Sequence, residues 1–167
     1  REFTQADVDI IGNTNKAQSD SEICNVIAST LLDCGLKNSQ FTISISNRKI
    51  IQGLIKELKI SDKNQELKVI RAIDKLERVG MKGVEDLLKK ERVDASGAVT
   101  KGANLSNDQT SQILNFIKIK NIQELKKVLK NPISTEGISE TEKLLEIASL
   151  GNFYNQIRTN FTIVRGL

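Results

Sequence analysis

The sequence predicts an α+β fold, in which strands near the two ends of the chain flank a long helical block. Residues 3–10 and 41–46 alternate apolar with polar side chains, the period of two that is typical of a strand with one buried face. Residues 159–165 also favour a strand. From residue 48 to about 157, apolar side chains recur every three or four positions, which predicts amphipathic helices. A chain of 167 residues with 38% hydrophobic residues can form an ordinary core, so one domain or two small ones are expected.

The first predicted strand lies in the opening sequence, REFTQADVDIIG. Its apolar face holds Ala6, Val8 and Ile10, and its other face holds Phe3, Gln5, Asp7 and Asp9. Gly12 ends the alternation. This strand would therefore present an amide and two carboxylates on one side.

A helix is predicted over residues 23–34. Ser19 and Glu22 have the spacing of a capping box, in which the two side chains bond free backbone N–H groups at the start of a helix. Gly35 is its expected stop. Cys24 and Cys34 lie ten residues apart on this helix, about 15 Å at 1.5 Å per residue, which is too far for a disulfide. Both cysteines are expected to be small core side chains.

A second strand is predicted at residues 41–46, and Asn47 is the predicted N-cap of the helix that follows. No strand is expected again until residue 159. The stretch 93–108, VDASGAVTKGANLSND, is rich in glycine and serine and predicts a mobile loop rather than a linker between domains. Its glycines lack the spacing of a phosphate-binding loop.

The composition excludes several classes of function. The chain contains no histidine, so its own residues cannot supply a Ser-His-Asp triad, a Cys-His pair or a histidine-bound metal, and no metal site is predicted. Aromatic residues make up only 4%, which argues against a stacking platform for single-stranded nucleic acid. No apolar run approaches the roughly 20 residues of a membrane-spanning helix, and the acidic start is unlike a signal peptide. We expect a cytoplasmic protein that does not bind membranes.

The basic charge is concentrated in the middle of the chain. Residues 1–46 carry three basic and six acidic groups, a net charge of −3, whereas residues 47–131 carry nineteen and eleven, a net charge of +8. Residues 132–167 carry three and four, a net charge of −1. Such a local excess attracts polyanions such as nucleic acid, although a solvated lysine-rich helical surface has the same composition.

Motifs at the two ends of the chain resemble those of one enzyme family. REFTQADVDIIG resembles the end of the second signature motif of class II aminoacyl-tRNA synthetases, in the form seen in the histidyl-tRNA synthetases. The final VRGL resembles the start of that family's Arg-Gly-Leu-Asp-Tyr-Tyr histidine signature. ISNRKIIQGLI and AIDKLERV are similar to segments of the family's helical insertion, so the resemblance covers the whole chain in order.

The resemblance implies a fold, an activity and a set of partners. The fold would be part of an antiparallel sheet flanked by helices, with residues 1–46 and 158–167 in the catalytic core and residues 47–157 in a mainly helical insertion. The family activates L-histidine with ATP and Mg²⁺ to an adenylate and transfers the histidine to tRNA(His). The parent protein would be a homodimer.

The resemblance also assigns roles to residues near both ends. Gln5 and Asp9 would contact the histidine substrate, with Asp9 holding its α-ammonium group, and Arg165 would be the catalytic cation near the carboxylate and the α-phosphate. Arg1 falls inside the motif and is a secondary candidate. The chemistry agrees, because a carboxylate forms a charge-assisted hydrogen bond with an ammonium and a guanidinium offers a planar fork to phosphate oxygens.

In the family, the insertion lies near the acceptor arm of the tRNA, and here it carries the basic excess. Phosphate contacts of this kind give an affinity that does not depend on sequence and weakens with salt. The basic side chains along its predicted helices are Arg48, Lys49, Lys56, Lys68, Arg71, Lys75, Arg78, Lys82, Lys89 and Lys90.

The resemblance further predicts that the chain is an internal fragment. The first and third signature motifs, the arginine that grips ATP and the anticodon-binding domain would lie outside it, so the fragment alone is expected to be inactive and to bind no cofactor. Two alternatives stay open. One is the synthetase-like regulatory subunit of ATP phosphoribosyltransferase, and the other is a helical nucleic-acid-binding module whose strands are incidental.

Overall fold

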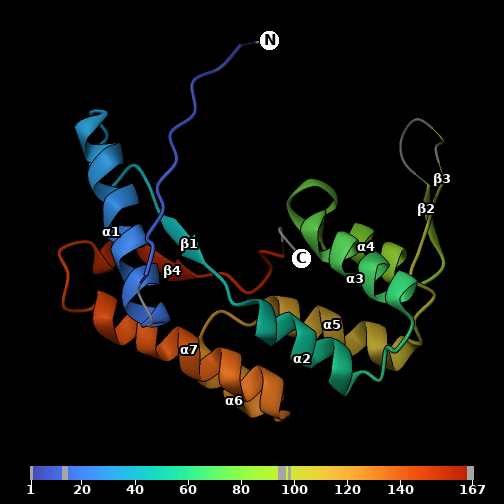
Figure 1. Ribbon diagram of the computed structural model, residues 1–167. Helices are drawn as coiled ribbons and strands as arrows, with labels where there is room; N and C mark the ends of the chain where they lie inside the picture. The colour runs from blue at the N-terminus through green and yellow to red at the C-terminus, as the bar shows by residue number, and fades with distance from the viewer. Residues whose placement is uncertain (1, 13–14, 94–96, 98, 165–167) are drawn as a thin grey trace. The chain divides into compact units, whose positions relative to one another are not determined.

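The computed structural model describes residues 2–12, 15–93, 97 and 99–164. Its helices are α1 (Lys16–Asp33), α2 (Arg48–Glu57), α3 (Lys63–Asp74), α4 (Leu76–Leu88), α5 (Asn107–Lys118), α6 (Ile122–Val128), α7 (Pro132–Ala148) and the short 3-10 helix η1 (Tyr154–Gln156). Its strands are β1 (Ile43–Ile45), β2 (Glu91–Val93), β3 (Val99–Lys101) and β4 (Ile157–Thr159) (Figure 1). The α+β class predicted from the sequence is confirmed.

The described strands form two small sheets, and the first pairs β1 with β4. The two strands run in the same direction (Figure 1), and just beyond them the Asn160 N–H donates to the Ile45 carbonyl at 2.9 Å. This pair is therefore parallel, whereas the resemblance implies an antiparallel sheet. Residues 46–156 lie between the strands, and a long crossover of this kind is what allows parallel pairing.

The strand predicted at residues 3–10 is not formed. Residues 2–12 contain no strand, and none of the strands in the described part of the chain pairs with them. Phe3 and Ile11 are 79% and 94% exposed. A strand is stable only where a neighbouring backbone satisfies its N–H and C=O groups and a core covers its apolar face. The alternation of apolar and polar residues in this segment has neither support in the structure.

The last strand is also shorter and earlier than predicted, because β4 ends at Thr159 instead of continuing to residue 165. The Asn160 side chain ends it. Its Oδ1 accepts hydrogen bonds from the Thr162 N–H at 3.1 Å and from the Thr162 hydroxyl at 2.7 Å. An asparagine that bonds the backbone two residues further on favours a turn over an extended chain.

A hairpin interrupts the helical block, where no strand was expected. β2 and β3 pair antiparallel, with Glu91 opposite Lys101 and Val93 opposite Val99. The prediction that residues 93–108 form only a loop was therefore wrong. Valine and threonine favour strands, and they stand here on both sides of a short segment that contains Gly97.

α1 begins earlier than predicted and ends where predicted. Asn15 is its N-cap, with its side-chain oxygen accepting a backbone N–H of the first turn, and Ser19 lies inside the helix. Gly35 follows the helix with φ +91°, and its N–H donates back to the Leu32 carbonyl at 2.8 Å. This bond satisfies a carbonyl that the end of the helix would otherwise leave free.

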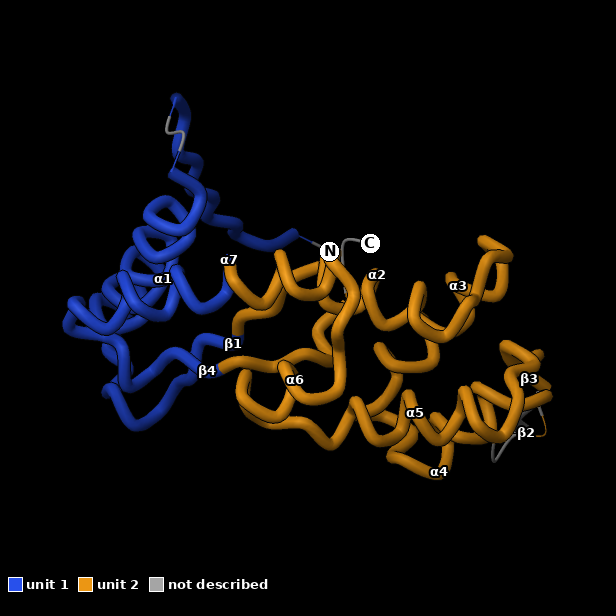
Figure 2. Tube along the Cα trace, turned by 90° about the horizontal axis from the view of Figure 1, so that it is seen from below, with its two compact units in different colours: residues 1–44, 140–158 blue, residues 45–139, 159–167 orange. Residues whose placement is uncertain are grey.

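Figure 2 shows the two compact units of the chain, residues 1–44 with 140–158 and residues 45–139 with 159–167. In the first unit, Cys24 and Ala28 of α1 are buried together with Ile157 of β4. Cys34 is exposed, so the expectation of a core position was wrong for this cysteine, and both thiols are free. In the second unit, the largest fully buried apolar side chains are Phe116, Ile50, Leu54, Ile73, Leu88, Ile113, Leu125 and Leu129.

In the second unit, α2 and the first half of α7 meet backbone to backbone. A Cβ on Gly53 would lie 2.5 Å from the Ser134 Cβ and 2.8 Å from the Ser134 N. A Cβ on Gly137 would lie 2.8 Å from the Lys49 Cβ. The Asn131 Nδ2 donates to the Gly53 carbonyl at 2.7 Å. These two segments can lie this close only because both helices carry glycine at the contact.

Polar side chains fix the ends of the same contact. The Asn47 Oδ1 accepts from the Lys49 N–H at 2.9 Å, which confirms the predicted N-cap of α2. The Glu57 Oε1 accepts from the Lys130 and Asn131 N–H groups at 2.6 and 2.8 Å. α2 is thus capped at its start and, near its end, accepts hydrogen bonds from the segment that leads into α7.

We predict that Gly53→Ala lowers the free energy of unfolding by about 1 to 3 kcal/mol, because the added methyl must push the Ser134 backbone away and overpacking has costs of this size. The higher helix propensity of alanine offsets part of this loss. Urea unfolding measures the change in the free energy of unfolding, and Ser111→Ala on the exposed face of α5 is the control. A Gly53→Ala variant as stable as the parent would contradict the close contact.

We predict that Thr110→Val raises the free energy of unfolding by about 1 kcal/mol, because the buried Thr110 hydroxyl has no hydrogen-bond partner among the described residues. Thr141 is also buried but has an interaction partner, so Thr141→Val is the matched control and should be destabilising. Thermal unfolding of the two variants compares them. Destabilisation of equal size in both would show that the Thr110 hydroxyl is satisfied after all.

Candidate functional site

Of the predicted amino-acid site, the structure describes Gln5 and Asp9. Gln5 and Asp9 are exposed on the segment 2–12, which forms no strand, so the common strand face expected for them is absent. The Gln5 Nε2 donates to the two Asp7 carboxylate oxygens at 2.9 and 3.1 Å. Arg165 and Arg1, the other predicted site residues, lie outside the described residues.

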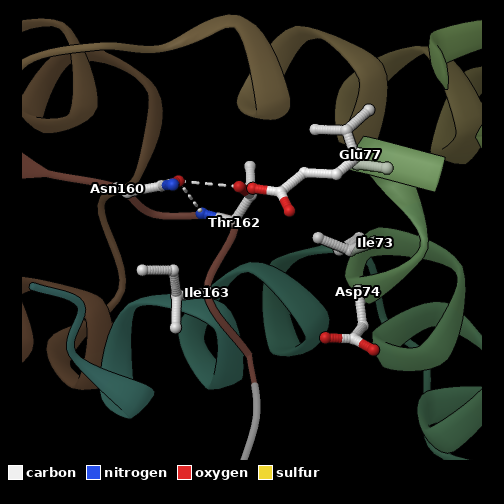
Figure 3. A pocket seen from close by; sticks show the side chains of 7 residues that line it. Ile73, Asp74, Glu77, Asn160, Thr162 and Ile163 are labelled. Atoms are coloured by element: carbon white, nitrogen blue, oxygen red, sulfur yellow. Dashed lines mark hydrogen bonds between the residues drawn. The ribbon is translucent and has the colours of Figure 1, made fainter. Parts of the chain in front are cut away.

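A pocket of about 230 Å³ lies beside the turn that follows β4 (Figure 3). Asp74 at the end of α3 and Glu77 in α4 supply carboxylates, and Asn160 and Thr162 supply an amide and a hydroxyl from the turn. The apolar part of its lining consists of Ile73, Leu76 and Ile163. These residues were not predicted from the sequence, where the local signal was a turn, with Asn160 two residues before Thr162.

The chemistry of this pocket favours a cationic or hydrogen-bond-donating group, because carboxylates form their strongest hydrogen bonds with charged donors. It holds two carboxylates in the described lining. Across residues 2–12, 15–93, 97 and 99–164, no three acidic, histidine or cysteine side chains form a group that could hold a metal ion.

The basic side chains of the predicted insertion lie mostly on the surface of α2, α3 and α4. Two of them are engaged by acidic partners. The Lys49 Nζ lies 2.6 Å from the Glu136 Oε1, and the Lys89 Nζ lies 2.6 Å from the Glu85 Oε1. Arg48, Lys56 and others keep their charge available on the surface, so the basic excess read from the sequence is present as exposed charge in the second unit. Across the described part of the chain, no helix is long and apolar enough to cross a membrane.

Three described groups have shifted pKa values. Burial raises the pKa of Asp20, and the negative charge of Glu140 raises it further. Burial and the nearby Asp20 raise the pKa of the Cys24 thiol, which keeps it protonated and unreactive at neutral pH. The hydrogen bond from Lys89 lowers the pKa of Glu85. Asp20 and Cys24 both lie in the first unit.

Known proteins match the sequence of the chain over its whole length. A histidine–tRNA ligase from Pelagibacter ubique is 66% identical over 169 aligned residues, which cover all of this chain and 36% of that protein. The resemblance to the histidyl-tRNA synthetases is confirmed. Histidine–tRNA ligases from Bartonella bacilliformis and Ruegeria pomeroyi are 36% and 33% identical, again over the whole chain. The chain spans about a third of the length of these relatives, and no protein-family model matches it.

Solved structures share the fold. A histidyl-tRNA synthetase from Nostoc sp. PCC 7120 superposes with a TM-score of 0.70 at 22% identity and covers 91% of this chain and 34% of that one. A Bacillus halodurans protein described as an ATP phosphoribosyltransferase regulatory subunit/histidyl-tRNA synthetase superposes with a TM-score of 0.67 at 17% identity, covering 89% and 36%. At such identities, the two superpositions show a common fold and nothing further.

We predict that Asp20→Asn stabilises the protein at pH 7 and that this gain shrinks towards pH 3. The folded state binds the Asp20 proton more tightly than the unfolded state, so stability contributed by this group falls as the pH rises above its ordinary pKa of 3.8. Asparagine carries no charge, so the Asp20→Asn variant does not lose this stability as the pH rises. Unfolding midpoints between pH 3 and 7 measure the effect, and Glu140→Gln should reduce it. If the stability difference between Asp20→Asn and the parent protein were the same at pH 3 and at pH 7, titration of Asp20 could not be its cause.

Proposed function

We propose that the chain is a portion of a histidine–tRNA ligase, which in the whole protein activates L-histidine with ATP and transfers it to tRNA(His). The observation that carries this proposal is the 66% identity to a histidine–tRNA ligase along all of this chain. The aligned region covers the whole chain and so includes both end motifs. Aminoacyl-tRNA ligases form an aminoacyl adenylate first, and Mg²⁺ with ATP would supply the activated phosphate for that step.

In this proposal, Asp9 holds the α-ammonium group of histidine, and Gln5 contacts another part of the same substrate. Both side chains are exposed and belong to the segment 2–12, which forms no strand. The hydrogen bonds from Gln5 to Asp7 would have to break before Gln5 could bond the substrate. Binding would therefore order this segment, since the amide and the carboxylate have to be held in one place to orient the amino acid.

Arg165 is the proposed catalytic cation, with Arg1 as a secondary candidate. A guanidinium stays charged at any working pH and binds two oxygens at once. Placed beside the α-phosphate, Arg165 would stabilise the negative charge that develops when the histidine carboxylate attacks the α-phosphorus and the bond to the leaving pyrophosphate breaks. Residues 1–46 and 158–167 would then belong to the catalytic core and residues 47–157 to the insertion.

tRNA(His) is the proposed macromolecular partner, bound in part through the exposed basic residues of α2, α3 and α4. A homodimer and a cytoplasmic location remain predictions from the family resemblance. The synthetase-like regulatory subunit of ATP phosphoribosyltransferase is the second candidate, favoured only by the fold shared with the Bacillus halodurans protein. A helical nucleic-acid-binding module without an enzyme's site explains neither the identity at the ends nor its extent.

We predict that the full-length protein catalyses histidine-dependent exchange of pyrophosphate into ATP and that Asp9→Asn slows this exchange at least 100-fold at low histidine concentration. The loss should fall mainly on the KM for histidine, because Asp9 contacts the substrate and not the reacting phosphate. Asp7→Asn is the matched control and should have less than a threefold effect. The 167-residue chain alone should show no exchange.

Arg165→Ala should instead lower kcat with little change in KM, since its contact forms in the transition state. A full-length protein that is folded but shows no histidine-dependent exchange would contradict the ligase and favour the regulatory subunit. Equal effects of Asp7→Asn and Asp9→Asn would contradict the assignment of Asp9.

A further inference from the structure

The turn after β4 connects this strand to the segment that carries Arg165. Arg165 itself lies outside the described residues, whereas residues 160–164, which lead directly to it in the sequence, are described. The Ile163 N–H donates to the Asn160 carbonyl at 3.2 Å, which closes the turn. The Asn160 Oδ1 accepts hydrogen bonds from the Thr162 N–H at 3.1 Å and from the Thr162 hydroxyl at 2.7 Å (Figure 3). These three bonds fix the direction in which the chain leaves β4.

The start of the turn is anchored to two neighbouring segments. The Asn160 N–H donates to the carbonyl of Ile45, the last residue of β1, at 2.9 Å. The Thr159 hydroxyl donates to the Lys120 carbonyl, just beyond α5, at 3.3 Å. All four residues belong to the second unit. The main chain of Asn160 is therefore held in place, and its side chain determines how residues 161–164 continue from it.

The side chains of the turn divide between the core and a hollow. Phe161 and Val164 are buried, at 3% and 4% exposed. Asn160, Thr162 and Ile163 instead line the pocket of about 230 Å³ together with residues of α3 and α4. A side chain that lines a hollow lacks packed neighbours on that side. On the pocket side, the conformation of the turn therefore depends on the hydrogen bonds of Asn160 more than on packing.

We propose that Asn160 is a positioning residue for Arg165, with Thr162 as its hydrogen-bond partner. This inference rests on the proposed function, in which Arg165 stabilises negative charge at the α-phosphorus. A guanidinium stabilises developing charge best when it is already in place, and a displacement of about 1 Å can slow a reaction about 100-fold. In this proposal Asn160 touches neither histidine nor ATP, and it acts through the backbone of residues 161–164.

The test measures histidine-dependent exchange of pyrophosphate into ATP by variants of the full-length protein. Asn160→Ala removes the acceptor of both side-chain hydrogen bonds. It should lower kcat about tenfold or more and change the KM for histidine less than about threefold, because Arg165 is proposed to act in the transition state.

Asn121→Ala is the matched control for the loss of an asparagine side chain. The Asn121 Oδ1 accepts the Glu124 N–H at 2.9 Å at the start of α6, in the same unit. Loss of this N-cap should lower the melting temperature and leave kcat unchanged. A loss of kcat in Asn121→Ala as large as that in Asn160→Ala would overturn the proposal, because general destabilisation would then explain both.

Conservative variants separate positioning from stability. Asn160→Asp keeps an oxygen that accepts both hydrogen bonds but adds a negative charge beside Asp74 and Glu77, so it should lower the melting temperature and retain kcat. Thr162→Val removes only the hydroxyl bond and should lower kcat less than Asn160→Ala does, whereas Thr162→Ser should restore it. These milder variants test the proposal even where Asn160→Ala does not fold. If kcat followed the melting temperature across all of them, the role of Asn160 would be structural only and the proposal would be overturned.

A double-variant cycle identifies the residue through which Asn160 acts. If Asn160 only positions Arg165, its loss has no further effect once the guanidinium is gone, so the double variant Asn160→Ala, Arg165→Ala should be as slow as Arg165→Ala alone. Losses that multiply would overturn the proposal. An unchanged kcat in Asn160→Ala, with an active parent protein, would overturn this inference and leave the proposed function intact. A folded parent protein without histidine-dependent exchange would overturn both.

Discussion

The contact between α2 and the start of α7 is the constraint on which the rest of the second unit depends. Gly53 and Gly137 let the two backbones approach, and Asn131 joins them through the Gly53 carbonyl. The same device recurs elsewhere in the unit. The Gln109 Nε2 of α5 donates to the Leu58 carbonyl at the end of α2 at 2.8 Å, and Gln65 of α3 reaches the segment after β3. Uncharged side-chain amides that donate to main-chain carbonyls thus join helices of this unit to neighbouring segments.

We propose two separate tasks for the charges of the chain. The groups proposed to bind the amino acid and ATP come from the ends of the sequence, where Gln5, Asp9 and Arg165 stand in motifs that resemble those of the histidyl-tRNA synthetases. The groups proposed to bind RNA come from the middle, among the exposed basic residues of α2, α3 and α4. Positive charge that attracts a polyanion over a distance is thereby kept apart in sequence from the few groups that must be aligned with a small substrate.

Local signals in the sequence predicted the helices well, because caps and helical periodicity depend on residues within one or two turns. Asn47 was found for this reason. The strands were predicted less well, since a strand depends on a partner that the local sequence does not name. Residues 3–10 have a strand pattern and no partner among the described residues, whereas the β2–β3 hairpin has partners and a weak pattern.

The parallel pairing of β1 with β4 has a consequence for how this architecture can vary. Every residue from 46 to 156 belongs to one closed loop between the two strands. The entropy lost on closing a loop grows only with the logarithm of its length, about 0.6 kcal/mol for each doubling. Insertions or deletions between the strands therefore change the free energy of pairing β1 with β4 very little. Selection can lengthen, shorten or recharge the intervening helices while the strands stay in register.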